Sequence, residues 1–180
     1  MAIHQSANTQ ARRSFTHALA LDPDYAAAAA FLGLAHCFEW LFWNPSPQVL
    51  AQAWEQAQRA CSQDDALPEA HGISGVLYAL SKQPEQALAE GERAIALNSN
   101  LADGYVWLGL ILSYQDKPKE ALGVLQQALR LNPHPPFPYF GSLGMACYLL
   151  RRYEGSIVAY FNATMAKPFK WTYQGKPLAA

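Results

Sequence analysis

A pattern of small and large apolar residues recurs along the chain at a nearly constant spacing. In most copies a small residue is followed four positions on by a larger apolar residue and three further on by another small one, and apolar residues then lead to a turn. The turns lie at Pro23, Asp65, Ser99, Pro133 and Pro168, which are 42, 34, 34 and 35 residues apart. A fixed period of this length indicates a stack of similar structural units.

Each unit is predicted to be a pair of helices. The spacing of three and four residues places the small and large residues on one helical face. Earlier in each unit a glycine lies within an apolar run, at Gly33, Gly75, Gly109 and Gly144. Glycine in a helix interior costs about 1 kcal/mol relative to alanine, so its return at one register predicts that two helices press together there. No run of alternating β-branched residues occurs, and no sheet is predicted.

The repeat boundaries follow from the same periodicity. We expect a single array over residues 8–168 and a C-terminal tail at 169–180. Gly33 precedes the next small residue, Ala53, by 20 positions, whereas the other three glycines precede theirs by 12. The first full repeat therefore carries about eight extra residues, which fall within 39–48. The predicted units are a half repeat at 8–23 and full repeats at about 26–65, 68–99, 102–133 and 136–168.

The periodic residues resemble the tetratricopeptide repeat, a 34-residue unit with the consensus W-x2-L-G-x2-Y followed by A-x3-F, A and P. The chain departs from this consensus at Gly91, where a large aromatic is preferred, and at Ser156, where alanine is preferred. The resemblance implies an all-α fold, a right-handed α-solenoid of antiparallel helix pairs. The copy most similar to the consensus consists of Tyr105, Leu108, Gly109, Ala121, Leu125, Ala128 and Pro133.

A finer resemblance concerns the strings at residues 18–25, 33–36, 131–136 and 148–154. They look like a bacterial repeat array that lies C-terminal to class III adenylate or guanylate cyclase domains, or to winged-helix regulatory domains. No cyclase or DNA-binding segment occurs in the sequence. This resemblance implies an alternative function, a regulatory or oligomerisation segment of such a cyclase or transcription regulator.

The resemblance also implies where a partner would bind. In the family, the first helix of each pair lines the concave face of the superhelix, and its inner stripe contacts the ligand. Transferred by register, the candidate partner-binding residues are Leu34, Phe38, Glu69, Val76, Leu80, Asp103, Val106, Leu110, Tyr114, Phe137, Phe140 and Tyr148.

The chemistry of this stripe narrows the class of partner. It contains two acids and no base, so it does not suit an acidic peptide, which needs charge-assisted donors. An apolar, aromatic stripe suits an amphipathic helix or an extended apolar segment of a partner protein. The alternative is that these side chains pack between neighbouring repeats, as apolar helical stripes usually do. The leading hypothesis is a scaffold for protein–protein interaction.

Residues 38–43 concentrate four aromatic side chains beside the extra residues of the first repeat. Trp40, Phe42 and Trp43 are a candidate aromatic anchor, because aromatic residues dominate the hot spots of interfaces. The alternative, which we favour, is that this segment lengthens the first helix and covers the missing half-hairpin ahead of it.

Charge and cysteine content exclude several partner classes. Thirteen basic and 14 acidic residues give a net charge of −1, which favours neither nucleic acid nor an anionic membrane. The longest nearly uncharged stretch, residues 25–38, is too short to span a bilayer. Cys37, Cys61 and Cys147 are far apart and indicate thiols in a reducing compartment. We expect a soluble, cytoplasmic bacterial protein.

No catalytic, cofactor or metal motif is recognisable. No two of the five histidines have the i, i+4 spacing of a helical metal site. His36 and Cys37 are adjacent on a helix and point in different directions, and Asp64-Asp65 is typical of a turn. The sequence has no phosphate-binding loop, no Gly-x-Ser-x-Gly and no Cys-x-x-Cys. We expect neither an enzyme nor a bound cofactor.

The two ends of the array are expected to expose apolar surface. The array begins with an unpaired second helix and ends after another one, before a tail that contains Phe169, Trp171 and Tyr173. Stacked repeats need polar outer faces at their ends. We therefore hypothesise a homo-oligomer formed end to end, or adjacent helices of a longer protein that cover these ends.

Overall fold

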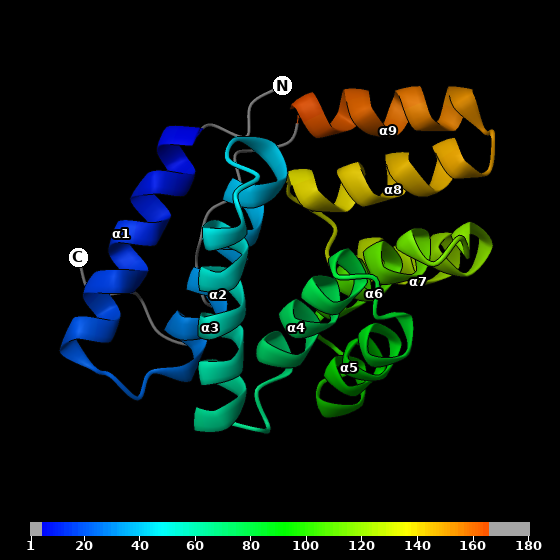
Figure 1. The fold of residues 1–180 in the computed structure, drawn as a ribbon. Helices are drawn as coiled ribbons and strands as arrows, with labels where there is room; N and C mark the ends of the chain where they lie inside the picture. Colours follow the sequence, from blue (N-terminus) through cyan, green and yellow to red (C-terminus); the bar gives the residue numbers. More distant parts are fainter. Residues whose placement is uncertain (1–4, 166–180) are drawn as a thin grey trace.

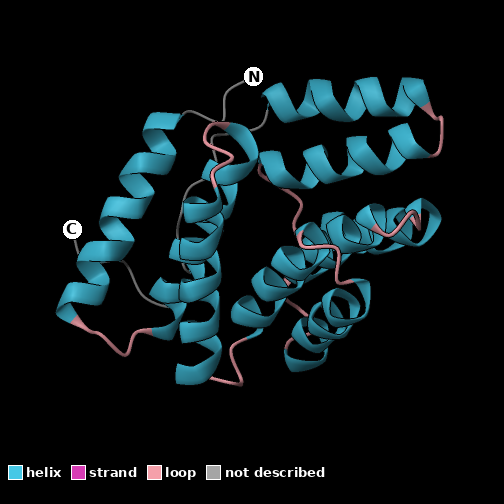
Figure 2. Ribbon diagram, in the orientation of Figure 1, coloured by secondary structure: helices cyan, strands magenta, loops and turns pink. Residues whose placement is uncertain are grey.

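The computed structural model describes residues 5–165, and all regular elements in that range are α-helices (Figure 2). This confirms the all-α fold predicted from the period. The predicted tail at 169–180 lies outside the described residues. In chain order the helices are α1 (Gln5–Leu21), α2 (Ala26–Phe42), α3 (Pro47–Gln63), α4 (Pro68–Leu80), α5 (Pro84–Leu97), α6 (Ala102–Tyr114), α7 (Pro118–Leu131), α8 (Phe137–Leu149) and α9 (Tyr153–Met165).

Four antiparallel pairs, α2–α3, α4–α5, α6–α7 and α8–α9, stack in chain order, and α1 packs against α2 at one end (Figure 1). In Figure 1, α2 and α3 run upright whereas α8 and α9 lie across the view, so successive pairs turn as the solenoid advances. The first helices of the pairs contact one another, α2 with α4, α4 with α6, and α6 with α8. Within the described range, no contact joins α3, α5, α7 and α9 to one another. The inner helices α2, α4, α6 and α8 therefore form the concave layer, and α3, α5, α7 and α9 are the outer helices.

The extra residues of the first full repeat lengthen both of its helices. α2 contains 17 residues, whereas α4, α6 and α8 contain 13 each. α3 also contains 17 residues, against 14 in α5 and α7. Ser46 caps the start of α3 by accepting a hydrogen bond from the Val49 N–H at 3.3 Å, and Pro47 opens the helix. The insertion thus adds about one helical turn to each helix of this pair.

The four periodic glycines lie where the inner and outer helices of each pair cross. A Cβ atom added at Gly33 would lie 3.1 Å from the Ala53 carbonyl oxygen of α3, and one at Gly75 would lie 3.0 Å from the Ala87 carbonyl oxygen of α5. At Gly109 and Gly144 the added atom would meet the side chains of Leu125, at 2.5 Å, and Tyr160, at 2.9 Å. The close approach predicted from the glycine register is confirmed at all four positions.

A recurrent turn links the inner and outer helices of the last three pairs. The inner helix of each of these pairs ends in a Schellman motif, in which the residue after the C-cap has a positive φ. Lys82 has φ 58°, Asp116 has 56° and Arg151 has 58°. Side chains disfavour this conformation by roughly 1–2 kcal/mol. The motif is closed by backbone hydrogen bonds from the N–H groups of Gln83, Lys117 and Arg152 to the carbonyl oxygens of Tyr78, Leu112 and Cys147, respectively.

A second recurrent turn joins one repeat to the next. At the residue before each of the first four predicted turn positions, an Asp or Asn side chain accepts a hydrogen bond from the backbone N–H two residues on. This Asx turn ends the preceding helix and orients the next. The pairs are Asp22 with Asp24, Asp64 with Ala66, Asn98 with Asn100 and Asn132 with His134, at 3.1, 2.9, 3.0 and 3.1 Å.

The apolar core extends along the array. The largest cluster runs from α1 to α6 and includes the fully buried Ile73, Leu77 and Ile111. Two smaller clusters continue it through α6, α7 and α8, around Leu125 and Tyr139. The core is therefore shared between neighbouring pairs of the stack, as expected for a solenoid.

Candidate functional site: the concave face

The concave layer is apolar because the inner helices are surrounded. Each inner helix packs against its own outer helix, against the neighbouring inner helices, and in α4, α6 and α8 against the preceding outer helix. An inner helix therefore presents only a narrow stripe to the concave side. Any partner that binds in the curve of the array would contact this stripe.

The structure divides the twelve predicted groove residues by their accessibility. Leu34, Val76 and Val106 are buried, so in this structure they contribute to the packing between helices. Tyr114 and Tyr148 are the most open, at 42% and 61% exposure. The remaining seven are half-buried: Phe38, Glu69, Leu80, Asp103, Leu110, Phe137 and Phe140.

Three of the half-buried residues are large and apolar, one on each of the first three inner helices. Phe38 of α2, Leu80 of α4 and Leu110 of α6 all pack against the largest core cluster while keeping part of their surface open. Tyr114, one turn after Leu110, is close enough to Cys37 of α2 for that thiol to affect it electrostatically. Burial is the main cause that raises the pKa of the Tyr114 hydroxyl, with Cys37 second. We call Phe38, Leu80, Leu110 and Tyr114 the apolar row.

The two acids of the stripe lie in the first turns of α4 and α6. Burial raises the pKa of the Glu69 carboxyl, and the nearby Asp103 and Asp64 carboxylates add to the shift. Burial also raises the pKa of the Asp103 carboxyl. The concave layer thus carries an acidic edge at the beginning of its helices and the apolar row nearer their ends.

Asp103 also links two repeats. Its Oδ1 accepts a hydrogen bond from the Tyr139 hydroxyl of α8 at 2.6 Å, which opposes part of the rise in its pKa. Burial, the Asp103 charge and this hydrogen bond together raise the pKa of Tyr139. The sequence pattern did not single out Tyr139, which lies beside the predicted Phe140; its one signal was an aromatic hydroxyl on an apolar helix, which needs a buried acceptor.

The aromatic segment at the end of α2 is partly packed. Phe42 is 44% exposed and its ring lies 6.1 Å from Phe38 and 5.8 Å from Trp43, between centroids. Trp40 and Trp43 are half-buried. Trp40 and Phe42 lie in the lengthened α2, the part of the favoured alternative that the structure shows, and Phe42 is the most accessible member of the candidate anchor.

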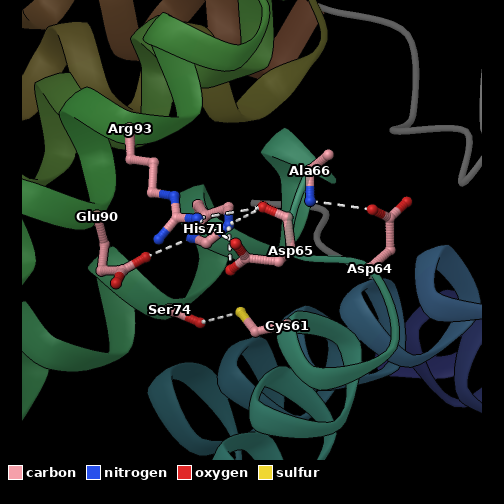
Figure 3. Close-up of polar contacts among 8 residues, drawn as sticks. All are labelled: Cys61, Asp64, Asp65, Ala66, His71, Ser74, Glu90 and Arg93. Carbon is pink, nitrogen blue, oxygen red and sulfur yellow. Dashed lines mark hydrogen bonds and ion pairs between the residues drawn. The ribbon is translucent and has the colours of Figure 1, made fainter.

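A polar cluster ties the α3–α4 turn to the second pair (Figure 3). His71 of α4 is buried, with Nδ1 2.6 Å from Glu90 Oε2 of α5 and Nε2 2.9 Å from the Asp65 carbonyl oxygen. Both partner oxygens can accept a hydrogen bond. The Asp65 carboxylate pairs with Arg93 of α5, and Cys61 contacts Ser74 at 3.6 Å.

This cluster is structural in its geometry. His71 and Glu90 use their polar atoms on each other and on the turn, and His71 is closed off from solvent. Asp64 and Asp65 serve the turn, as predicted, since Asp64 forms the Asx turn and Asp65 pairs with Arg93. Elsewhere, burial raises the pKa of Cys37 to about 12, and burial followed by the Arg12 charge lowers the pKa of His36.

Residues 5–165 contain neither a membrane-spanning helix nor a cluster of metal-ligating side chains. No helix in this range combines the length and the apolar character needed to cross a bilayer. The same range brings together no group of three His, Cys, Asp or Glu side chains that could hold a metal ion.

Comparisons with known proteins support the repeat fold. Residues 102–135 match the family model described as tetratricopeptide repeat. No curated protein matches the chain. Among solved structures, the tetratricopeptide protein TTC0263 of Thermus thermophilus is 18% identical with a TM-score of 0.65, covering 84% of this chain and 78% of that one.

Two further structures resemble the array at fold level. PilF of Pseudomonas aeruginosa is 20% identical with a TM-score of 0.56, covering 93% of this chain and 72% of that one. YrrB, described as a tetratricopeptide protein with an unusual peptide-binding site, is 19% identical with a TM-score of 0.51, covering 89% and 78%. Residues 102–135 therefore match the tetratricopeptide repeat, and the described chain shares the fold of solved tetratricopeptide structures.

Proposed function

We propose that the chain is a non-catalytic scaffold that binds an apolar segment of a partner protein on its concave face. The observation that carries this proposal is the apolar row, in which Phe38, Leu80 and Leu110 come from three successive inner helices and remain partly open. Tyr114 extends the row with an accessible ring. Because these side chains are already held in place by the core, a partner that covers them gains contact area with little loss of side-chain conformational entropy.

The chemistry of the face favours an amphipathic helix or an extended apolar segment as the ligand. The apolar row contains no charged residue, and the nearby acids Glu69 and Asp103 would repel an acidic peptide. YrrB, one of the similar structures, is described as having a peptide-binding site, which is consistent with this use of the fold. The buried Leu34, Val76 and Val106 would act by supporting the row rather than by touching the ligand.

A selection from a random peptide library displayed on phage, using the full chain as bait, tests the proposal. We expect enriched peptides to have apolar residues at helical or alternating spacing and no excess of acids. Changing Leu110 and Tyr114 together to Glu should weaken the capture of an enriched peptide roughly thirtyfold, the loss typical of a hot spot.

The matched control lies on an outer helix. Leu97 of α5 is 41% exposed, nearly the same as Tyr114 at 42%, so Leu97→Glu matches the Tyr114→Glu half of the double variant in charge and in exposure. It should leave capture unchanged. If Leu110→Glu reduces helicity by circular dichroism, Tyr114→Ser alone provides the test. Enrichment of acidic peptides, or equal losses for Tyr114 and Leu97, would contradict the proposal.

The regulatory alternative, in which the array acts on a covalently linked cyclase or winged-helix domain, stays a prediction from the finer resemblance. The same selection bears on it, because a scaffold captures a separate polypeptide without help from a linked domain.

A further inference from the structure

The two ends of the described array differ in polarity. At the first end, α1 buries Asn8, Ala11, Phe15 and Leu19 against the array. Its open positions are polar or small, except for Leu21 at the end of the helix. The expectation of exposed apolar surface at both ends is therefore wrong for the described part of the first end, because α1 is amphipathic with a polar outer side.

At the other end of the array, α9 (Figure 1) exposes several large apolar side chains. Between Gly155 and Met165 the helix carries no charged residue, and six of its apolar side chains are 45–72% exposed. At 100° per residue they lie on the side opposite the buried Ser156, Ala159 and Ala163, an arc that they share with the exposed Glu154 and Thr164. We define the α9 face by these residues: Tyr153, Ile157, Val158, Tyr160, Phe161 and Met165.

Part of this face is open because the described chain has no further repeat beyond α9. Ile157 and Tyr160 occupy the positions of Leu122 and Leu125 in α7, where Leu125 is 1% exposed beneath the next pair. The absence of a further described repeat accounts for the exposure of Ile157 and Tyr160, and not for the exposure of the other residues of the α9 face.

The rest of the α9 face departs from the outer helices in composition. The position of Phe161 is Glu92 in α5 and Gln126 in α7, and both of those are exposed. Similarly, Val158 and Met165 replace residues that are small or polar in α7, Gly123 and Arg130. A side of the helix that is solvated elsewhere in the array is apolar only here, which indicates a binding surface rather than an interrupted stack.

We infer that a second copy of this chain covers the α9 face, in a symmetric tail-to-tail dimer. A two-fold contact places the same patch on both sides. The α9 face suits such a contact because residues 155–165 carry no charge and the acid Glu154 lies in the first turn of the helix, so two copies that meet over residues 155–165 oppose no like charges. A head-to-tail form of the end-to-end contact would instead set this apolar face against the polar side of α1. This inference goes beyond the proposed function and does not depend on the concave face.

The available area suits such a dimer. Taking about 200 Å² for each aromatic side chain, the exposed parts of Tyr153, Tyr160 and Phe161 amount to roughly 300 Å². The three aliphatic side chains add roughly 200 Å² at about 100 Å² each. Two copies would bury about 1,000 Å², which is the lower limit for a specific interface. A dimer that dissociates on dilution is therefore expected.

Sedimentation equilibrium of the full chain over about a hundredfold range of concentration tests the inference. The expected result is a reversible monomer–dimer equilibrium with no larger species, because a two-fold contact closes. The double variant Ile157→Lys/Phe161→Lys should be monomeric throughout, with the helicity of the original chain. Leu21 is 70% exposed at the opposite end, and the control Leu21→Lys should dimerise like the original.

Mixing the original chain with a labelled Ile157→Lys/Phe161→Lys variant separates the two modes of contact. In the tail-to-tail dimer the variant has no usable face, and no mixed species should form. In a head-to-tail contact the variant would still offer its α1 end, and a mixed dimer would appear. A chain that stays monomeric at all concentrations, a mixed dimer, or loss of dimer in Leu21→Lys would each overturn the inference.

Discussion

The inner and outer helices of the array are built on different residue patterns, although they alternate along one chain. Outer helices such as α5 and α7 bury one narrow stripe, Ala87, Gly91 and Ala94 in α5, and turn polar side chains outward. Inner helix α4, by contrast, buries eight consecutive residues, Ala70 to Leu77. The concave face is therefore apolar for a packing reason, because an inner helix has no fully solvated side on which a charged side chain would keep its hydration.

The largest expected effect comes from filling an inner crossing. Gly75→Val should destabilise the chain by about 3 kcal/mol, the upper range for overpacking, because the added Cβ would lie 2.8 Å from Ile111 and 3.0 Å from the Ala87 backbone. Gly123→Val on outer helix α7 is the matched control. Nothing lies within 4 Å of that position, so it should be neutral or slightly stabilising through helix propensity. Urea denaturation of both variants measures the contrast, and equal losses would refute the crossing account.

The next effect concerns the polar link between an inner and an outer helix. His71→Leu should cost about 2 kcal/mol, because it leaves Glu90 and the Asp65 carbonyl without their partner. Replacing both His71 and Glu90 by Leu should recover part of that loss, since no unpaired acid remains. Thermal unfolding of the single and double variants checks this, and a double variant less stable than the sum of the two singles would argue against it.

The turns between inner and outer helices predict a smaller gain. Lys82→Gly should stabilise the chain by about 1 kcal/mol, because Lys82 has φ 58° and glycine adopts this conformation without a steric penalty. Asn44→Gly is the control, since the turn of the first pair contains no residue with positive φ. Denaturant midpoints should rise for the first variant only, and a rise in both would mean that flexibility in general is the cause.

The smallest effect is a pH dependence confined to the acidic edge. The pKa of Glu69 is raised in the folded chain, so its contribution to stability is complete below the unfolded pKa. That contribution is lost as the pH rises through the folded pKa. Glu69→Gln should therefore flatten the dependence of the free energy of unfolding on pH, from the ordinary range of a carboxyl upward. An unaltered profile in Glu69→Gln would show that Glu69 ionises in the folded chain as it does in the unfolded one.

The sequence predicted the pairing of helices better than the accessibility of their stripes. The glycine register predicted all four helix crossings, because a position that has no room for a side chain lies where a second helix approaches closely. Leu34, Val76 and Val106 share a periodic stripe with Leu110 and Tyr114, yet they are buried. Periodicity predicts which side of a helix faces the other helix of its own pair. Burial also depends on the orientation of the next inner helix, which the periodicity does not give.

Polar links between elements were not predictable from the pattern. Asp103 and Tyr139 are 36 residues apart, and His71 and Glu90 are 19 apart, on helices whose register to one another only the packed array defines. The Asx turns, in contrast, recur with the repeat period and join residues only two apart in the sequence. Their Asp and Asn positions can therefore be predicted from the turn spacing.

Backbone hydrogen exchange of the full chain, with and without a bound peptide from the phage selection, tests most directly whether the inner helices form the binding face. The account predicts slower exchange in α2, α4 and α6, around Phe38, Leu80 and Tyr114, with little change in α3, α5 and α7. Protection confined to the outer helices, with the inner helices unchanged, would contradict it.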